Sequence, residues 1–463
     1  MLGGPIRSLF CVNILYLHCH DAGRHISPHG HAVHTPHLAR LAQGGTLFRN
    51  AHTAAPTCSP SRAALLTGRT PHEVGMLGLA HHGWGLTEGS PHLAPRLREH
   101  GFETVLCGIQ HEINHYHPTP GLALGYDHEI TPPSDELSLA AQDECIARTA
   151  AEWLTNRPSA AAPFLLTAGF FMPHRPFVSA DPSQPYQDPR YVTVPAHLPD
   201  NAAVRQDIAD YHASVAHFDQ CVGVVLNGLE QSGLADDTLV IATTDHGIAF
   251  PGMKCNLTDR GTGVFLILRG PGFTGGETVD AMVSQLDVLP TILDAIGAST
   301  SPELSGRPLQ PLAAGQTNQL HDHLFAEVTF HSSYEPMRSV RTDRYKYIRR
   351  FAPEQTTVQV SNCDNGPAKQ HLLASGWERQ RIAPIQLFDL AHDPGEAFNL
   401  AGQLDLAAVE RELADQLDQW MQSTHDPLLQ GAITPPPNVI ATTHDSLSRQ
   451  QAARRKRLAS PSS

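Results

Sequence analysis

The sequence lacks several features that would place it in a specialised class of protein. Its 463 residues include eight cysteines, yet no two of them stand at the Cys-x-x-Cys spacing of zinc ribbons and thiol oxidoreductases. No stretch approaches the roughly 20 consecutive apolar residues of a membrane-spanning helix, and no internal repeat stands out. These absences leave a globular chain that is long enough for one large domain and a smaller one.

The chain also has little positive charge, with 32 Lys and Arg against 46 Asp and Glu, and a formal net charge of −14. This balance argues against a surface for nucleic acid, so any anionic ligand must be held by local cations and backbone N–H groups. Residues 1–8 contain no apolar core of the kind found in secretory signals. We therefore expect a cytoplasmic protein that binds neither nucleic acid nor membrane.

Buried-strand patterns alternate with helical patterns along the first two thirds of the chain. We expect strands at residues 11–17, 104–107, 163–169, 238–242 and 264–268, and helices at residues 35–41, 93–100, 135–156, 209–231 and 284–296. Such alternation predicts an α/β fold whose central sheet is mostly parallel and flanked by helices.

The pattern changes after about residue 320. Residues 338–350 are expected to form a hairpin, residues 386–390 a further strand and residues 404–424 a helix. We therefore predict a catalytic domain over residues 1–325 and a smaller C-terminal α+β subdomain over residues 326–445, with an antiparallel sheet and a helix. Residues 446–463 contain a basic run and Ser-Pro ends, and are predicted to be a disordered tail.

The most informative stretch, residues 57–69, combines a helix start with a nucleophile. Ser59 is a favourable N-cap and Pro60 suits the first helical position, which would place Cys58 just outside the helix, on the rim of a pocket. Free N–H groups and the positive end of the helix dipole favour an anion at that place. A buried structural cysteine before an ordinary helix is the alternative.

Polar residues also follow several expected strands. His20 and Asp21, His111, His174, and Asp245 with His246 all come at or after strand ends, and Lys254 follows closely. The carboxyl ends of parallel strands meet at one edge of a sheet, so we expect these groups to converge with Cys58 and Arg62. Two carboxylates beside an anion-binding helix start indicate a hard cation paired with an oxyanion ligand.

The spacing Cys58-x-Pro60-x-Arg62, followed by Leu-Thr-Gly-Arg at residues 66–69, resembles the sulfatase signature, whose cysteine is oxidised to formylglycine. Segments 13–23, 48–79, 164–176, 238–254 and 387–400 also look like sulfatase segments. The runs FRNA, GMLGL and FPGMKCNL are most similar to the heparan N-sulfatase branch. The resemblance implies an alkaline-phosphatase-like fold.

The resemblance also implies roles for the converging residues. Asp21, Asp245 and His246, with His20 and the formylglycine from Cys58, would bind one divalent cation, usually Ca²⁺ in sulfatases. Arg62 would help to ionise the hydrated aldehyde, His174 and Lys254 would stabilise or protonate the leaving group, and His111 would accept a proton when sulfate departs.

Three positions depart from the sulfatase pattern: His20 replaces the first of two adjacent aspartates, Ile109 replaces a lysine, and His246 replaces an asparagine. Imidazole ligands shift the preference of a site from Ca²⁺ toward Mn²⁺ or Zn²⁺.

The leading hypothesis is a sulfatase that cleaves a small sulfate ester or sulfamate, with a saccharide as a candidate carrier, after activation by a formylglycine-generating maturation enzyme. A phosphonate or phosphate ester hydrolase on the same scaffold is the first alternative, and an inactive homologue that binds sulfated glycans is the second.

Trp84 would either line a sugar pocket or pack on the core.

Overall fold

The computed structural model describes residues 12–114, 117–133, 137–158, 161–299, 301–437 and 439–442. Its largest element is an eight-stranded sheet with strand order β10-β2-β9-β7-β1-β6-β4-β5. These strands are β1 (Asn13–Cys19), β2 (Thr46–Phe48), β4 (Glu103–Gly108), β5 (His128–Glu129), β6 (Phe164–Gly169), β7 (Thr238–Thr244), β9 (Leu266–Arg269) and β10 (Glu277–Val279). All pairings are parallel except those that β9 makes with β7 and β2, which confirms the mostly parallel sheet.

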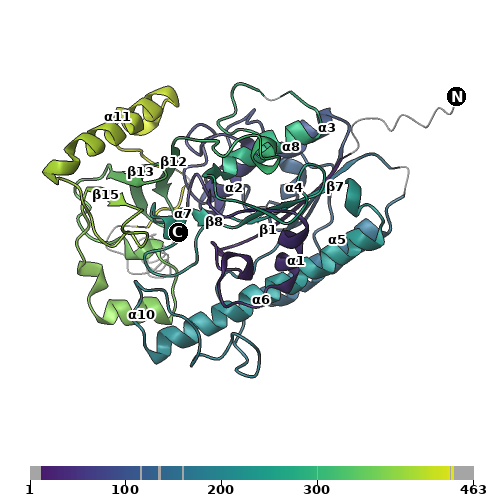
Figure 1. Cartoon of the computed structure of the whole chain (residues 1–463), viewed down its shortest axis with the longest axis horizontal. Helices are drawn as coiled ribbons and strands as arrows, with labels where there is room; N and C mark the ends of the chain where they lie inside the picture. The colour runs from purple at the N-terminus through teal and green to yellow at the C-terminus, as the bar shows by residue number, and fades with distance from the viewer. Residues whose placement is uncertain are drawn as a thin grey trace, which may run out of the picture.

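Alternate residues of the central strand β1 enter two separate cores, one on each face of the sheet. Leu15 and Leu17 pack with helices α1 (Pro36–Gly44), α5 (Leu139–Thr155) and α6 (Ala202–Gln231). Ile14 and Tyr16 pack on the opposite face with α2 (Cys58–Thr67), α3 (Leu93–Glu99), α8 (Val288–Ala295) and α9 (Gln310–Ala313). Figure 1 shows α5 and α6 below the sheet and α3 and α8 above it. A strand buried on both faces is uniformly apolar, which explains why β1 was recognisable in the sequence.

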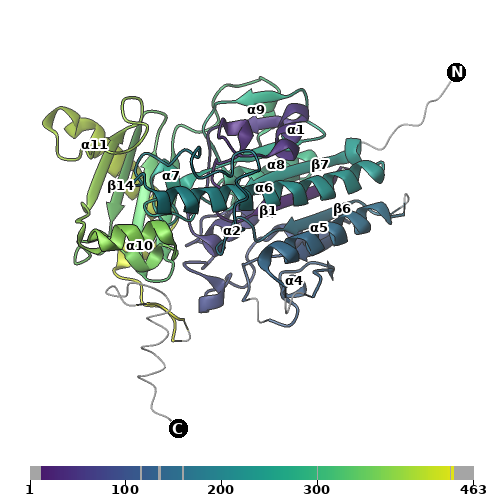
Figure 2. The ribbon, with the colours of Figure 1, turned by 90° about the horizontal axis from the view of Figure 1, so that it is seen from below.

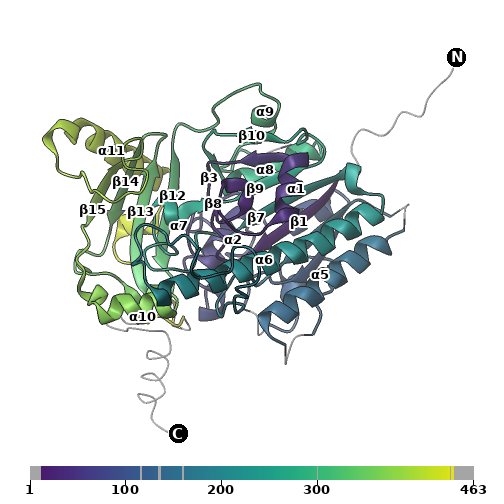
Figure 3. The ribbon, with the colours of Figure 1, turned by 60° about the horizontal axis from the view of Figure 1, so that its bottom comes forward.

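A second sheet belongs to the C-terminal part of the chain. Its four strands are all antiparallel: β12 (Leu324–Phe330), β13 (Tyr334–Arg341), β14 (Tyr345–Arg350) and β15 (Ile385–Asp389). Helix α11 (Ala407–Ser423) packs Leu413, Leu417 and Met421 against this sheet. The sheet and α11 lie beside the large sheet (Figures 1 and 3), and helix α10 (Pro367–Ala374) extends back to contact α6. The antiparallel sheet and the helix were both expected.

Small elements complete the fold. They are β3 (Ala51–His52), β8 (Gly263–Val264) and β11 (Val283–Ser284), which form a three-stranded sheet, and the single-turn helices α4 (Pro120–Ala123) and α7 (Asp259–Thr262). Helix α7 lies where the large sheet meets the C-terminal part (Figure 2). Among the described helices, none is long and apolar enough to cross a membrane.

The start of helix α6 and the end of strand β1 differ from the predicted boundaries. Helix α6 begins seven residues earlier than its apolar stripe indicated, at Ala202, because the Asn201 side chain accepts hydrogen bonds from the amides of Ala203 and Val204. Strand β1 extends through His18 and Cys19, so these residues belong to the strand and do not follow it. The predicted basic tail lies outside the described residues.

Candidate active site

Helix α2 places Cys58 inside the molecule. The helix starts at Cys58 with Thr57 in extended conformation as its N-cap, and all ten of its residues are buried. The prediction that Ser59 caps this helix is wrong, because the Ser59 hydroxyl accepts a hydrogen bond from the amide of Ala80 instead. The expected rim position is also wrong, since only 2% of Cys58 is exposed. Cys58 therefore lies at the bottom of the site, at the N-terminal end of a buried helix.

Asp21 and Asp245 meet because their strands are neighbours. Cys19 of β1 is in register with Thr244 of β7, so the two aspartates lie at the same edge of the sheet. The amide of Asp21 donates to Oδ1 of Asp245 at 2.8 Å, with Asp21 in the left-handed region at φ 51°. The Tyr211 hydroxyl donates to the Asp21 carbonyl at 3.2 Å. Both carboxylates are completely buried, so each requires a charged or hydrogen-bonding partner.

Two imidazoles join the carboxylates. Nδ1 of His20 lies 3.0 Å from Oδ2 of Asp245, and Nε2 of His246 lies 3.4 Å from Sγ of Cys58 and 3.5 Å from Oδ1 of Asp21. Nδ1 of His246 is 2.9 Å from the Gly247 carbonyl and donates to it, which turns Nε2 toward Cys58 and the two carboxylates.

These side chains form a donor set that fits a divalent cation. One ligand atom from each of His20, Asp21, Cys58 and Asp245 lies within 4.8 Å of the others. We refer to these four residues and His246 as the metal cluster. Two buried carboxylates supply the negative charge that a divalent ion needs.

Two buried cations flank the carboxylates, one on each side. Arg62 donates from Nη2 to Oδ2 of Asp245 at 3.1 Å and to the Cys19 carbonyl at 3.0 Å. Nζ of Lys254 lies 3.0 Å from Oδ1 of Asp21 and 2.9 Å from Oδ2 of Asp364. Asp364 was not predicted from the sequence, because this residue lies in an irregular segment of the C-terminal part and no pattern links it to Lys254.

The structure also assigns a neighbour to Arg62 that the sequence analysis missed. Nη1 of Arg62 contacts Nδ1 of His18, an inward-pointing residue of β1. Burial, together with the charge of Arg62, lowers the pKa of His18 well below 6.5, so this imidazole is neutral and can accept a hydrogen bond from the guanidinium. A polar residue within an otherwise apolar strand is the one sequence signal that could have identified it.

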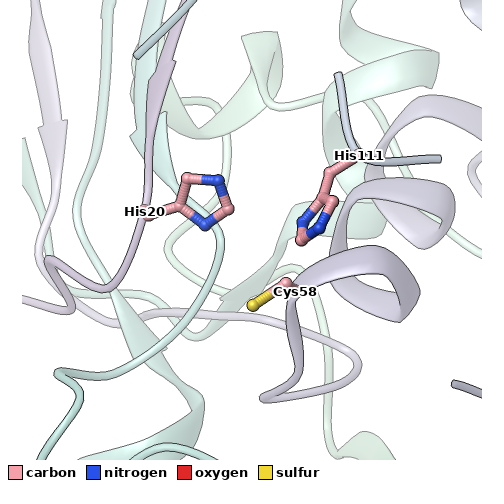
Figure 4. A group of neighbouring side chains, drawn as sticks. All are labelled: His20, Cys58 and His111. Carbon is pink, nitrogen blue, oxygen red and sulfur yellow. The ribbon is translucent and has the colours of Figure 1, made fainter. Parts of the chain in front are cut away.

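His111 and His174 complete the group that was expected to converge. Each of their rings lies 5.3 Å from the His20 ring, edge-on. Figure 4 shows His20 and His111 on opposite sides of the Cys58 sulfur. Burial, reinforced by His20 and Arg62, lowers the pKa of His111 well below 6.5, so it is neutral at pH 7 and able to accept a proton. His81, which the sequence analysis did not single out, stacks on His111 with ring centroids 5.5 Å apart.

Trp84 belongs to the core. Its ring lies 5.0 Å from that of Phe330, and the residue packs in a cluster with Met76 and Val74 at 9% exposure. Of the two readings of Trp84, packing on the core is therefore the one that the structure supports.

The mostly parallel sheet, the buried helix start and the converging polar groups agree with the alkaline-phosphatase-like fold that was expected. The sulfatase family model matches residues 13–298, and the model described as N-sulphoglucosamine sulphohydrolase, C-terminal, matches residues 254–383. The chain therefore belongs to the sulfatase family, whose members are sulfuric ester hydrolases.

Individual relatives agree with this assignment. The human N-sulphoglucosamine sulphohydrolase is 31% identical over 474 aligned positions, which cover 90% of this chain and 91% of the relative. The solved structure of BT4656 in complex with D-glucosamine-2-N,6-O-disulfate has a TM-score of 0.69 at 18% identity, and the match covers 90% of this chain and 98% of the other. The phosphonate monoester hydrolase of Agrobacterium radiobacter has a TM-score of 0.66 at 20% identity, covering 92% and 100%. These two structures share the fold.

Proposed function

We propose that this sulfatase hydrolyses a sulfamate or sulfate ester on a saccharide, with the sulfamate of an amino sugar as its first candidate. One observation carries the proposal: Sγ of Cys58, at the start of a buried helix, lies within 4.8 Å of ligand atoms of His20, Asp21 and Asp245. The choice of an amino-sugar sulfamate rests on the 31% identity to the human N-sulphoglucosamine sulphohydrolase and on the matching C-terminal family model.

The proposal includes one divalent cation and a formylglycine at position 58. Asp21, Asp245, His20 and His246 would hold the ion, and imidazole donors favour Mn²⁺ or Zn²⁺ over the Ca²⁺ that is usual in the family. The ion would act as a Lewis acid. Hydrated formylglycine would carry two hydroxyls on one carbon, of which one would attack sulfur and the other would allow sulfate to be released.

The surrounding residues would orient the substrate and move protons. Arg62, fixed by Asp245 and the Cys19 carbonyl, presents a permanent positive charge beside position 58. Neutral His111 would accept a proton on one side, while His174 and Lys254 would donate to the leaving atom on the other. Overall, one water is consumed, the S–O or S–N bond breaks, its electron pair stays on the leaving atom with a proton, and sulfate is released.

A phosphonate or phosphate ester hydrolase is the second candidate. His246 follows Asp245 where sulfatases usually carry asparagine, and the phosphonate monoester hydrolase shares the fold. An inactive homologue that binds sulfated glycans is less favoured, because Cys58 and Asp245 are both present.

Mass spectrometry of the Cys58 peptide, from protein made with an active maturation enzyme, tests the nucleophile first. Conversion to formylglycine lowers the peptide mass by about 18 Da and makes it reactive toward hydrazides. The converted protein is then assayed on N-sulfoglucosamine, a sugar O-sulfate and a phenylphosphonate monoester, with the Cys58→Ala variant as control. Turnover of the phosphonate alone would favour the second candidate, and binding without any turnover would favour the third.

A further inference from the structure

A segment of the C-terminal part contacts Lys254 and Arg175, the residue that follows His174. Residues 362–369, which we call the clamp segment, follow strand β14 in the chain and include the first residues of helix α10. Oδ2 of Asp364 in this segment is 2.9 Å from Nζ of Lys254, and both side chains are almost completely buried. Since Asp21 belongs to the metal cluster, Asp364 gives the Lys254 ammonium a second carboxylate partner outside that cluster.

Lys254 lies at the edge of a cavity. Lys254 and Cys363 both line this cavity of about 290 Å³ between the loop after β7 and strands β13 to β15. A four-carbon side chain beside a cavity is not packed on every side, so its ion pairs contribute to where the ammonium lies. The pairs with Asp21 and Asp364 hold the ammonium between the metal cluster and the clamp segment.

The other end of the clamp segment restrains the neighbour of His174. A Cβ atom at Gly366 would lie 2.5 Å from Nη1 of Arg175, so the glycine backbone packs directly on this guanidinium. Asp207 accepts from Arg175 at 2.7 and 2.9 Å and also accepts from the amide of Ala368 at 3.2 Å. Arg175 directly follows His174, so the placement of this histidine depends on the same segment.

The clamp segment is itself held in one conformation. Nζ of Lys369 donates to the Cys363 carbonyl at 2.7 Å and to Oδ1 of Asn365 at 3.1 Å. Oδ1 of Asn362 accepts from the amides of Ser332 and Ser333 at 3.0 and 2.8 Å, which ties the segment to the C-terminal sheet.

We propose that the clamp segment positions Lys254 and His174 for expulsion of the leaving group, with Asp364 as the positioning residue. The inference rests on the proposed function, because it assigns these two residues to the leaving atom. The inference adds that the C-terminal part contributes to the cleavage step. In that step the S–O or S–N bond breaks, its electrons remain on the leaving atom, and that atom takes a proton from Lys254 or His174.

The test compares substrates whose leaving groups differ in their need for a proton. In the converted enzyme, Asp364→Asn should lower kcat on N-sulfoglucosamine, which expels an amine, by about tenfold or more, because a small misplacement of a proton donor is costly. The same variant should change kcat on 4-nitrophenyl sulfate by less than about threefold, because nitrophenolate leaves without protonation. Asp364→Glu should recover part of the loss, and KM should change little in either variant.

Asp418→Asn is the matched control, because Asp418 is paired with Arg349 in the same part of the chain but lies away from the clamp segment. It should leave both rates unchanged. Equal losses on both substrates in Asp364→Asn, or no loss on either, would overturn the positioning role.

A second measurement does not depend on turnover. The sequence contains four lysines, so acetylation of Lys254 can be followed by peptide mass spectrometry with Lys346 and Lys456, which lie outside residues 362–369, as internal references. Asp364→Asn should increase the relative acetylation rate of Lys254 by about threefold or more, as the ammonium loses a partner. An unchanged acetylation rate would overturn the inference, whether or not the substrates are hydrolysed. A failure to hydrolyse either substrate would count against the proposed function alone.

Discussion

Two buried clusters in this protein contain nearly the same residue types but differ in arrangement. The metal cluster has Asp21 and Asp245 with imidazoles, and each carboxylate has its own cation, Lys254 or Arg62. The second cluster, which we call the anchor cluster, consists of His72, Glu327, Arg338 and Asp426. In the anchor cluster a single arginine bridges both carboxylates.

Ion pairs and hydrogen bonds join the charged groups of the anchor cluster to one another. Arg338 lies 3.2 Å from Oε2 of Glu327 and 2.5 Å from Oδ2 of Asp426, and it also donates to the Val328 carbonyl. Glu327 accepts from both the amide and Nδ1 of His72, at 3.1 and 2.9 Å. The ligand atoms of His72, Glu327 and Asp426 lie close enough together for a metal ion, but the guanidinium already supplies the positive charge between the carboxylates.

The comparison shows that the placement of the cations relative to the carboxylates decides whether a buried cluster is suited to bind an ion or to stabilise the fold. In the metal cluster, among the described residues, an imidazole and no lysine or arginine lies near both carboxylates, so an ion can still be shared by them, whereas in the anchor cluster the arginine already bridges the two. The metal cluster should therefore control turnover, and the anchor cluster should control how firmly the C-terminal sheet is attached.

The largest effect is expected from Cys58→Ala. Removing the proposed nucleophile should reduce turnover by about 10⁴-fold or more, because catalytic residues act as a unit and the loss of one removes most of the rate enhancement. The melting temperature should change little, since the substitution removes one sulfur atom from the start of α2. Steady-state kinetics and thermal melting of the converted enzyme measure both, and full activity in the variant would contradict the nucleophile assignment.

The next effect concerns the anchor cluster. Arg338→Met leaves two buried carboxylates without their shared cation and should lower the free energy of unfolding by about 3–5 kcal/mol. Denaturant unfolding measures this loss, and kcat per folded molecule should stay near that of the parent protein. The triple variant Arg338→Met, Glu327→Gln, Asp426→Asn should recover part of the stability, and its failure to do so would argue against charge burial as the cause.

Removal of the metal should produce a smaller change in stability. Chelation should abolish turnover and reduce stability by about 3 kcal/mol if the ion is present at a hundred times its Kd. Elemental analysis should find one divalent ion per chain in the parent and in Glu327→Gln, but none in Asp245→Asn. An ion lost from Glu327→Gln would show that the anchor cluster, and not the metal cluster, binds it.

The smallest effect is a pH dependence that originates in the anchor cluster. Burial disfavours the charged form of His72, but the Glu327 carboxylate outweighs it and raises the pKa of His72 above 6.5. The folded protein then holds a proton that the unfolded chain releases, so this contribution is complete below pH 6.5 and is lost as the pH rises through the higher folded-state pKa. The melting temperature of the parent should therefore fall over this range, and His72→Gln should flatten the slope. An identical slope in the variant would assign the effect to other groups.

The sequence identified the residues whose positions follow from regular elements. Asp21 and Asp245 come directly after buried strands, and Cys58 and Arg62 belong to a helix, so the parallel sheet brought them together as expected. Three residues that contact the site were missed. His18 lies within strand β1, His81 in a 3₁₀ turn and Asp364 in an irregular segment. No periodicity links such residues to the partners that they contact.

The sequence by itself determined the mostly parallel sheet, the antiparallel C-terminal sheet and the family, because apolar periodicity and the Cys58 signature are local properties of the chain. The tertiary structure alone decided how charges are shared: Arg62 and Lys254 flank the metal cluster, whereas Arg338 fills the anchor cluster. It also decided that Cys58 is buried and that Asp364 holds Lys254. The physical reason is that the energy of a buried charge depends on every group within a few ångströms, and those groups come from segments that are distant in the chain.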